Sequence, residues 1–283
     1  MKHVFVIGGA AVDITGAPRQ ACRMRDSNIG KVTLRPGGVG LNIATHLAKN
    51  PVHVELITAI GADYRAGMIA DKCLADGVSM TYALRANEPS AAYMCMLDAD
   101  GDMLMGISDM EIINRITPAF LSPLLPAIEC ADMAVIDANL CADSIEFLCS
   151  SLNIPIFFDP VSSAKAARIG GSLGRCHAIK PNRFEASLLS GCSCDSLRGV
   201  ARAADWFLEQ GVGRVFISLA EDGIYWADAS GCGQFPSEAQ DVTDASGAGD
   251  AMSAAIIYGC LRGDSTEQCA KDGNAAAARF CVR

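Results

Sequence analysis

The sequence predicts an α/β fold, a doubly wound and mainly parallel sheet with helices on both faces, accompanied by a small β-sheet lid. Short apolar runs alternate with amphipathic stretches along the chain, which favours strands joined by helical crossovers. The runs are apolar throughout, which is typical of strands buried on both faces. Two segments break this alternation and supply the lid.

Six apolar runs are the predicted strands of the main sheet: residues 4–7, 54–60, 133–136, 154–158, 176–179 and 215–219. The amphipathic stretches between and after them are the predicted helices: residues 41–49, 66–75, 143–152, 183–189, 197–209, 248–261 and 266–280. Turns and helix-like segments follow the predicted strands, and this alternation implies a mainly parallel, doubly wound sheet.

The lid is predicted from strand-like runs with no helix between them. These are residues 31–35, 91–97 and 103–107, and the turn Asp98-Ala-Asp-Gly-Asp102 joins the last two. We expect a lid built from about 14–36 and 88–108, inserted in one domain that spans 1–283. An antiparallel extension of the main sheet explains the same pattern equally well.

The composition excludes several classes of protein. Lys and Arg number 23 against 32 Asp and Glu, a net charge of −9, and no basic run is present to bind nucleic acid. No uninterrupted apolar stretch is long enough to cross a membrane, and no secretory leader is visible. The 13 cysteines are scattered without a CxxC pair, so we expect reduced thiols in a cytoplasmic protein with a small-molecule ligand.

The turn Asp244-Ala-Ser-Gly-Ala-Gly-Asp250 precedes a predicted helix and is the most informative segment. Gly247, Ala248 and Gly249 bring backbone amides toward a ligand, and the helix start adds unpaired N–H groups, which together make an anion hole. Asp250 lies at its mouth, where it is the candidate general base for a hydroxyl that accepts a phosphoryl group. The alternative is an Asp that only caps its helix.

A second glycine turn, Gly37-Gly38-Val-Gly40-Leu-Asn42, also precedes a predicted helix, which makes the functional interpretation of both turns stronger. Neither turn is a Walker A loop or a G-x-G-x-x-G dinucleotide fingerprint, and Gly8-Gly9 after the first strand lacks that spacing too. No H-E-x-x-H or G-x-S-x-G motif is present. Oxidoreductase and hydrolase functions are therefore disfavoured.

These motifs resemble those of the PfkB or ribokinase family of carbohydrate and nucleoside kinases. The 37–42 turn resembles the N-terminal signature of that family, and the 244–250 turn resembles its C-terminal signature. The resemblance implies that Asp250 is the catalytic base. It also implies that Asn182 and Glu185, in Lys180-Pro-Asn-Arg-Phe-Glu185, organise Mg²⁺ and the nucleotide phosphates through water, Glu185 being the water-mediated metal ligand. Apart from this resemblance, Glu185 would be interpreted as an ordinary acidic residue in the first turn of a helix.

The same resemblance implies further contacts and partners. Asp13, Gly38 and Asn42 would bind the sugar hydroxyls, while Ser218 and Asn274 would lie at the adenine end. ATP and Mg²⁺ are the implied cofactors, with a monovalent cation as a further candidate. The family carries a β-sheet lid that often forms a dimer interface, so a homodimer through the lid is implied.

Four local segments resemble those of the family members that phosphorylate pseudouridine: residues 26–30, 108–110, 137–140 and 159–165. Asn139 and Lys165 follow predicted parallel strands, at the sheet edge where open α/β sheets bind ligands. Ser27 and Asn28, on the lid, are candidates to bind the uracil edge. The implied reaction is transfer of the γ-phosphoryl group of ATP to the 5′-hydroxyl of pseudouridine. A kinase for ribose, a ketose or another nucleoside, and a non-catalytic nucleoside-binding protein, are the alternatives.

Two positions depart from the family pattern. Ala11 stands where the family often has Asn, two residues before the sugar-binding Asp13. Ala220 stands where a Gly commonly follows the strand that carries Ser218. The first departure means that one expected sugar hydrogen bond is missing or is supplied by another residue. The second crowds the phosphate region unless only the amide of residue 220 is used.

Overall fold

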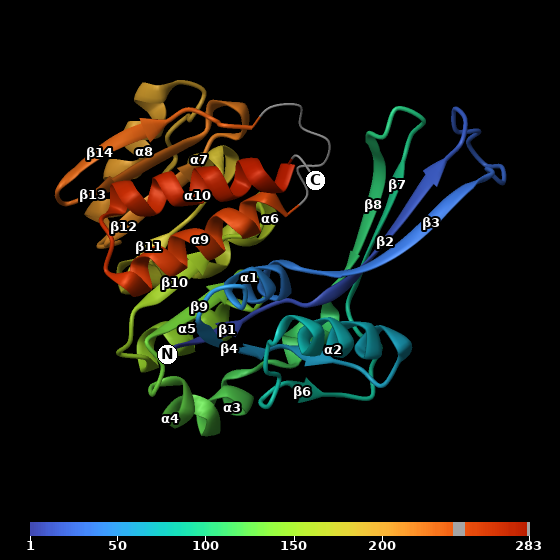
Figure 1. Cartoon of the computed structure of the whole chain (residues 1–283), viewed down its shortest axis with the longest axis horizontal. Helices are drawn as coiled ribbons and strands as arrows, with labels where there is room; N and C mark the ends of the chain where they lie inside the picture. The colour runs from blue at the N-terminus through green and yellow to red at the C-terminus, as the bar shows by residue number, and fades with distance from the viewer. Residues whose placement is uncertain (240–246, 282–283) are drawn as a thin grey trace.

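The computed structural model describes residues 1–239 and 247–281 and contains an eight-stranded main sheet (Figure 1). In spatial order its strands are β14 (Gly231–Phe235), β13 (Ile224–Asp228), β12 (Arg214–Ser218), β11 (Ala178–Ile179), β10 (Ile156–Asp159), β9 (Met133–Asp137), β1 (Lys2–Ile7) and β4 (Val52–Ile57). The strands from β12 to β4 pair in parallel, whereas β13 and β14 are antiparallel. The predicted mainly parallel sheet is confirmed.

Helices cover both faces of this sheet, because alternate strand residues point into two separate cores. Phe158 of β10 belongs to the first core, which also takes apolar side chains from α5 (Ala142–Ser151), α7 (Arg183–Ser190) and α8 (Leu197–Glu209). The neighbouring Phe157 belongs to the second core, which is shared by α1 (Val39–Leu47), α2 (Tyr64–Asp76), α9 (Ala248–Arg262) and α10 (Thr266–Cys281). Both phenylalanines are fully buried, as the apolar strand pattern predicts.

Short helices fill the connections. They are η1 (Glu111–Arg115), α3 (Pro118–Leu121), η2 (Ser122–Leu124), α4 (Leu125–Ile128), α6 (Ser163–Ala166), η3 (Ala167–Arg175) and η4 (Ala220–Asp222). The predicted strand over residues 54–60 is divided, because β4 ends at Ile57 and β5 (Ala59–Ile60) pairs instead with β6 (Leu84–Arg85). None of the helices in the described ranges combines the length and the apolar character of a membrane-spanning segment.

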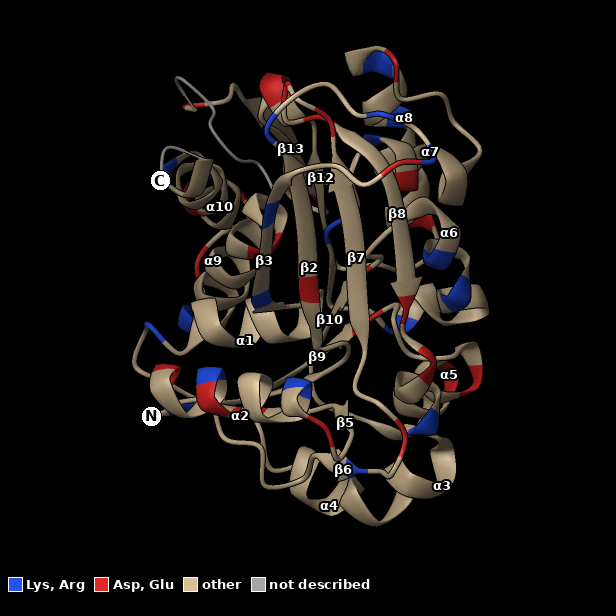
Figure 2. Cartoon of the chain, turned by 90° about the vertical axis from the view of Figure 1, so that its right-hand side faces the viewer, with Lys and Arg blue, Asp and Glu red and all other residues tan. Residues whose placement is uncertain are grey.

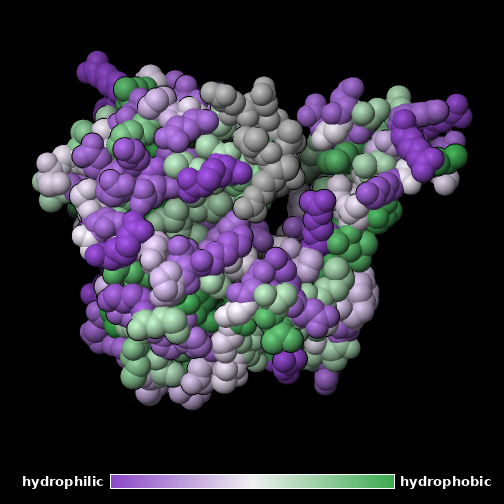
Figure 3. All heavy atoms as spheres, in the orientation of Figure 1, coloured by the Kyte–Doolittle hydropathy of each residue, from purple (hydrophilic) through white to green (hydrophobic). Residues whose placement is uncertain are grey.

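A four-stranded sheet projects from the body of the molecule (Figures 1 and 2). Its order is β3 (Gly30–Gly37), β2 (Ala11–Pro18), β7 (Ala92–Leu97) and β8 (Met103–Asp109). The sheet is separate from the main one, so an extension of the main sheet is the wrong interpretation of these segments. A notch separates it from the body in the space-filling view (Figure 3). Its action as a lid remains a prediction.

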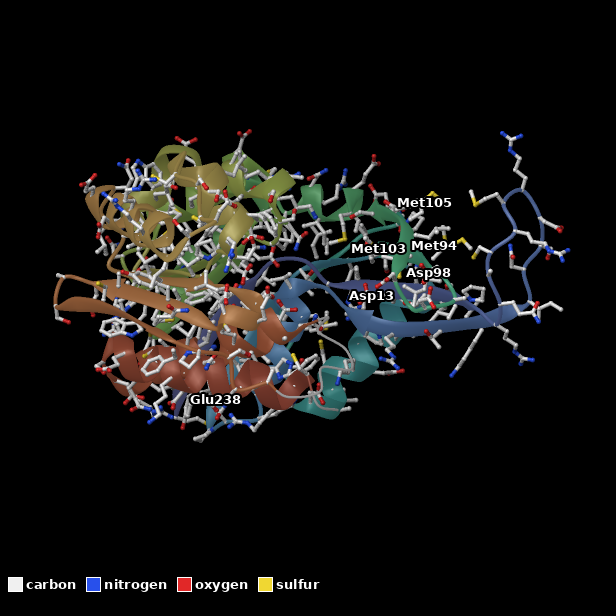
Figure 4. The ribbon with its side chains drawn as sticks, turned by 90° about the horizontal axis from the view of Figure 1, so that it is seen from above. Asp13, Met94, Asp98, Met103, Met105 and Glu238 are labelled. Carbon is white, nitrogen blue, oxygen red and sulfur yellow. The ribbon has the colours of Figure 1, made fainter. Side chains whose placement is uncertain are left out.

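The two faces of the projecting sheet differ in chemistry. Asp13 pairs with Tyr93 and Arg35, and Tyr93 pairs with Ser108, so one face is polar. The next register positions carry the apolar side chains Ile14, Leu34, Met94, Met96, Met105 and Ile107. Asp13, Met94 and Met105 are labelled on these strands in Figure 4. The polar face therefore carries the predicted sugar-binding Asp13.

Candidate active site

The turn that precedes α9 has the backbone form expected of an anion hole. Gly247 caps the helix with φ of +91°, a conformation that favours glycine. The amides of Asp250 and Ala251 donate to the Gly247 carbonyl oxygen at 3.1 and 3.0 Å, so the helical turn closes directly behind it. Ala248 and Gly249 supply first-turn amides, which have no partner within a helix. Residues 244–246 of the predicted motif lie outside the described residues.

The second glycine turn brings α1 to the same place. Gly38 caps α1 with φ of +96°, and a Cβ there would lie 2.8 Å from the Gly9 carbonyl oxygen, so no larger residue fits. Four residues later, Asn42 Nδ2 donates to Asp250 Oδ2 at 2.8 Å. The two turns predicted from the sequence therefore meet, and the carboxylate at the start of α9 is oriented by α1.

Asp13 lies against the same turn. A Cβ on Gly37 would overlap the Asp13 carboxylate, so the glycine allows β2 and β3 to hold that side chain between them. Burial raises the pKa of Asp13 above its ordinary value. The segment 37–42 thus contacts Asp13 at one end and Asp250 at the other.

Lys180 is a buried cation at the centre of the site. It follows β11, and its Nζ lies 3.5 Å from Asp159 Oδ2 and 3.5 Å from where a Cβ on Gly249 would lie. Asp159 is held by the hydroxyl of Ser253 on α9 at 2.9 Å and by the amide of Val161 at 2.9 Å. Val161 has φ of +67°, which is strained for a β-branched residue. This strain accompanies the amide contact that orients Asp159.

Burial and the charges around Lys180 together set the pKa of Asp250. Burial by itself lowers the pKa of Lys180, but Asp159, Glu185 and Asp250 outweigh it and raise the pKa above the ordinary value. Burial, aided by the charge of Asp159, raises the pKa of Asp250 to about 7, against the hydrogen bond from Asn42 and the charge of Lys180. A carboxylate with a pKa near neutrality is suited to take a proton from a hydroxyl.

Asn182 and Glu185 form a capping box at the start of α7. The backbone N–H of Asn182 donates to Glu185 Oε2, and the side-chain Nδ2 of Asn182 donates to Glu185 Oε1, both at 2.8 Å. In return, the backbone N–H of Glu185 donates to Asn182 Oδ1 at 2.9 Å. Glu185 is buried, which raises its pKa, whereas Lys180 lowers it. Both carboxylate oxygens therefore have partners within the cap, and a water-mediated contact of Glu185 with a metal stays a prediction.

Ser218 and Asn274, the residues predicted to border the adenine, lie on different elements, at the end of β12 and within α10. Ser218 bridges to Asn182, and its amide donates to the Pro181 carbonyl oxygen at 3.0 Å. Asn274, buried on α10, donates from Nδ2 to the Pro236 carbonyl oxygen at 2.7 Å. Its side-chain amide therefore already holds the chain that follows β14.

Asn139 and Lys165 form a polar pair beyond the ends of β9 and β10. Lys165 Nζ donates to Asn139 Oδ1 at 2.7 Å. Asp137 accepts from the amides of Gly9 and Asn139 at 2.9 and 2.8 Å, and burial raises its pKa to about 6. A Cβ on Gly9 would lie 2.6 Å from Asn139 Nδ2, so Gly9 is needed for this close contact.

Ser27 and Asn28 lie away from these residues. They are in the connection between β2 and β3, at the far tip of the projecting sheet (Figures 1 and 4). Ser27 is exposed and Asn28 is partly buried; Asn28 Oδ1 accepts from the Arg23 amide at 2.8 Å, and Asn28 Nδ2 donates to the Arg23 carbonyl oxygen at 3.0 Å. The structure does not bring them to the other predicted residues.

Sequence reasoning assigned no role to Lys180. The available signal was a lysine directly after a short run of apolar residues that becomes β11, since a charged group there is buried only when it is paired. Its carboxylate partners Asp159, Glu185 and Asp250 come from three other elements, and no local pattern identifies them. In the described ranges, no three His, Cys, Asp or Glu side chains are placed to hold a metal directly.

Comparisons with known proteins identify the family and the fold. A family model described as pfkB family carbohydrate kinase matches residues 1–282. The pseudouridine kinase of Escherichia coli K12 is 34% identical over 266 residues, covering 90% of this chain and 82% of that protein. A carbohydrate kinase from Agrobacterium tumefaciens is 25% identical, with a TM-score of 0.85 over 98% of this chain and 90% of that one. The Arabidopsis thaliana ribokinase complexed with ribose and ATP shares the fold at 22% identity, with a TM-score of 0.84 over 100% and 93%.

Proposed function

This chain belongs to the pfkB family of carbohydrate kinases, and we propose that it transfers the γ-phosphoryl group of ATP to the 5′-hydroxyl of pseudouridine. The observation that carries the kinase chemistry is the turn 37–42, which contacts Asp13 through Gly37 and Asp250 through Asn42. A sugar held by Asp13 would present its hydroxyl toward Asp250, because one short segment fixes both carboxylates.

In the proposed reaction, Asp250 accepts the proton of the 5′-hydroxyl as that oxygen bonds to the γ-phosphorus. The bond from the γ-phosphorus to the bridging oxygen breaks, and ADP leaves with the electron pair. The amides of Ala248 and Gly249 would stabilise the charge on the transferring group, and Lys180 would add a cation beside Gly249. Positioning and charge stabilisation supply most of the catalysis in such transfers.

The carboxylates of Asp159, Glu185 and Asp250 around Lys180 supply the negative charge that a hydrated Mg²⁺ needs, so the residues fit this ion. When bound, Mg²⁺ neutralises phosphate charge and aligns the triphosphate. Asn182 and Glu185 would hold its water shell, and Ser218 and Asn274 would border the adenine. ATP as donor is supported by the Arabidopsis ribokinase relative, whose structure contains ATP.

Pseudouridine as acceptor is supported by the Escherichia coli relative and by the pair formed by Asn139 and Lys165. The pair presents an amide and an ammonium group, which suit the carbonyl and N–H groups of a uracil ring. Ser27 and Asn28 would have to approach by movement of the projecting sheet. We therefore assign base recognition first to Asn139 and Lys165.

A screen of ADP release with MgATP tests this proposal across pseudouridine, uridine, inosine, ribose and fructose. We expect pseudouridine to be preferred over uridine and its product to carry the phosphate on the 5′-oxygen, as identified by NMR. Preference for ribose or a ketose would support another kinase of this family. Nucleoside binding without ADP release, measured by calorimetry, would support a non-catalytic binding protein and contradict the proposal.

We also propose that the apolar face of the projecting sheet binds a second copy of the chain. Met105 is 53% exposed and Ile107 is 54% exposed, and Met94 lies beside them on β7. Contiguous apolar side chains on one face of a thin sheet are costly in water. A twofold partner covers such a face with the identical surface, leaving the opposite polar face with Asp13 free for substrate.

A further inference from the structure

Two cysteines meet where α9 ends and α10 begins. Gly259 lets the helices approach closely, because a Cβ there would lie 2.8 Å from Cys269 Sγ and 3.5 Å from Cys269 Cα. Arg214, at the start of β12, donates from the same Nη1 atom toward Cys260 Sγ at 3.6 Å and toward Cys269 Sγ at 3.8 Å. The two sulfur atoms therefore share one cationic neighbour.

The surroundings of the two sulfur atoms are unequal. Arg214 is fixed by a hydrogen bond from its Nη1 to the Asp264 carbonyl oxygen at 3.0 Å. The Cys269 thiol and the His177 side chain hydrogen-bond to Cys260, and with the charge of Arg214 they lower the pKa of Cys260 despite burial. The hydrogen bond between the two thiols raises the pKa of Cys269, and burial raises it further. These interactions favour the negative charge on Cys260 over Cys269.

The two cysteines also differ in their exposure to solvent. Cys260 is partly exposed on α9, whereas Cys269 is fully buried beneath it. A small oxidant would therefore reach Cys260 first, and Cys269, which shares the Arg214 contact, is the neighbouring thiol. Reactive cysteines generally combine a stabilised thiolate, partial exposure and a nearby resolving thiol.

We propose that Cys260 is a peroxide-reactive cysteine and that Cys269 resolves it into a disulfide that links α9 to α10. The Cys260 thiolate attacks one oxygen of hydrogen peroxide, the O–O bond breaks, and the hydroxide that leaves is protonated to water. The Cys269 sulfur then displaces hydroxide from the resulting sulfenic acid, and the S–S bond forms as a second water is released. The two thiols lose two electrons and the peroxide gains them.

A second cysteine pair provides an internal control. Cys149 and Cys176 also interact with each other, but both are buried. The neighbouring Arg175 directs its Nε and Nη2 to the carbonyl oxygens of Cys149 and Leu152, at 2.9 and 2.7 Å. Without an exposed sulfur, this pair is expected to stay reduced under the same treatment.

Peptide mapping of the full chain tests the proposal. The protein is treated with a small excess of hydrogen peroxide, its remaining thiols are blocked with N-ethylmaleimide, and it is digested with trypsin. Trypsin cuts after Arg214, Arg262 and Lys271, so Cys260 and Cys269 fall in the adjoining peptides 215–262 and 263–271. Because Cys232 shares the first peptide, the measurement is made in wild type and in Cys232→Ser.

We expect peptides 215–262 and 263–271 to become disulfide-linked before the exposed Cys130 is oxidised. In Cys269→Ser, dimedone should trap a sulfenic acid on Cys260. In Arg214→Gln, oxidation of Cys260 should slow about tenfold. The mapping then follows peptide 203–262, because this variant loses the tryptic cut after residue 214. The proposal is overturned if the wild-type peptides stay separate while Cys130 is oxidised, or if the Cys149–Cys176 pair closes first. The wild-type result tests the proposal even if one of the variants folds poorly.

Discussion

Asn42 Nδ2 donates a 2.8 Å hydrogen bond to Asp250 Oδ2 across 208 residues of sequence. The bond joins the first helix of the chain to the start of α9 and fixes one oxygen of the proposed base. In the proposed reaction the same carboxylate accepts the proton of the substrate hydroxyl. This relation between α1 and α9 leads to the first two predictions.

Replacing Asp250 with Asn should lower turnover about 10²–10⁴-fold, because the proposed base is lost while the shape of the site is kept. Burial raises the folded-state pKa of Asp250 above its unfolded value, so the protonated side chain costs no stability below pH 4. Stability is lost as pH rises from there through about 7, because a buried carboxylate then forms. Asp250→Asn should therefore be about 1–3 kcal/mol more stable than wild type at pH 8, with no difference at pH 4. Steady-state kinetics and urea unfolding measure the two effects; unchanged turnover would remove Asp250 from the mechanism.

The pH dependence of turnover should follow Asp250. Since the base acts when deprotonated, the rate should rise with pH through a midpoint near 7. The Asn42 hydrogen bond favours the carboxylate, so Asn42→Ala should move this midpoint to higher pH. Thr45→Ala, one turn further along α1, is the matched control and should leave the midpoint in place. A shift to lower pH in Asn42→Ala would contradict the assignment.

Replacing Lys180 with Met should lower kcat/KM for MgATP about 10²–10³-fold, the usual loss when a group that stabilises transferring charge is removed. Asp159, Glu185 and Asp250 would then repel one another without compensation, so the midpoint of the pH–rate profile should also rise. Lys180→Arg keeps the charge and should recover part of the activity. A merely structural lysine would lower stability and leave the pH midpoint unchanged, which separates the two roles.

Ala220 adopts φ of +54°, in the left-handed region that favours glycine. The family pattern has Gly there, so Ala220→Gly should release strain and stabilise the protein by about 0.5–1 kcal/mol. Ala201→Gly, inside α8, is the matched control and should destabilise by about 1 kcal/mol. Chemical denaturation compares the two variants, and destabilisation by Ala220→Gly would show that the alanine methyl group contributes more than the strain costs.

Ile107→Glu combined with Met105→Glu should convert the proposed dimer to monomer, because two buried carboxylates would face each other across the twofold axis. Ser108→Glu, on the polar face, is the control and should keep the dimer. Analytical ultracentrifugation gives the masses. A wild-type monomer at micromolar concentration would refute the dimer without affecting the kinase proposal.

Much of the architecture was predictable because it depends on local patterns. The apolar runs predicted the parallel strands, the helix over 197–209 has the predicted bounds, and the turn after Asp98 joins β7 to β8. The strands β2, β13 and β14 were not predicted. Their sequences contain Gly, Asp or Pro, which disfavour strands locally, and pairing with neighbouring strands overrides that preference.

By itself, the sequence determined the alternation of strands and helices, the two glycine turns and the candidate base, since each depends on residues adjacent in the chain. Only the tertiary structure decided that the lid strands form their own sheet, that Asn42 reaches Asp250, and that Lys180 lies among three carboxylates. The physical reason is that hydrophobic periodicity specifies which face of an element is buried. The electrostatics of a site depend instead on which elements pack together, and that is set by the whole fold.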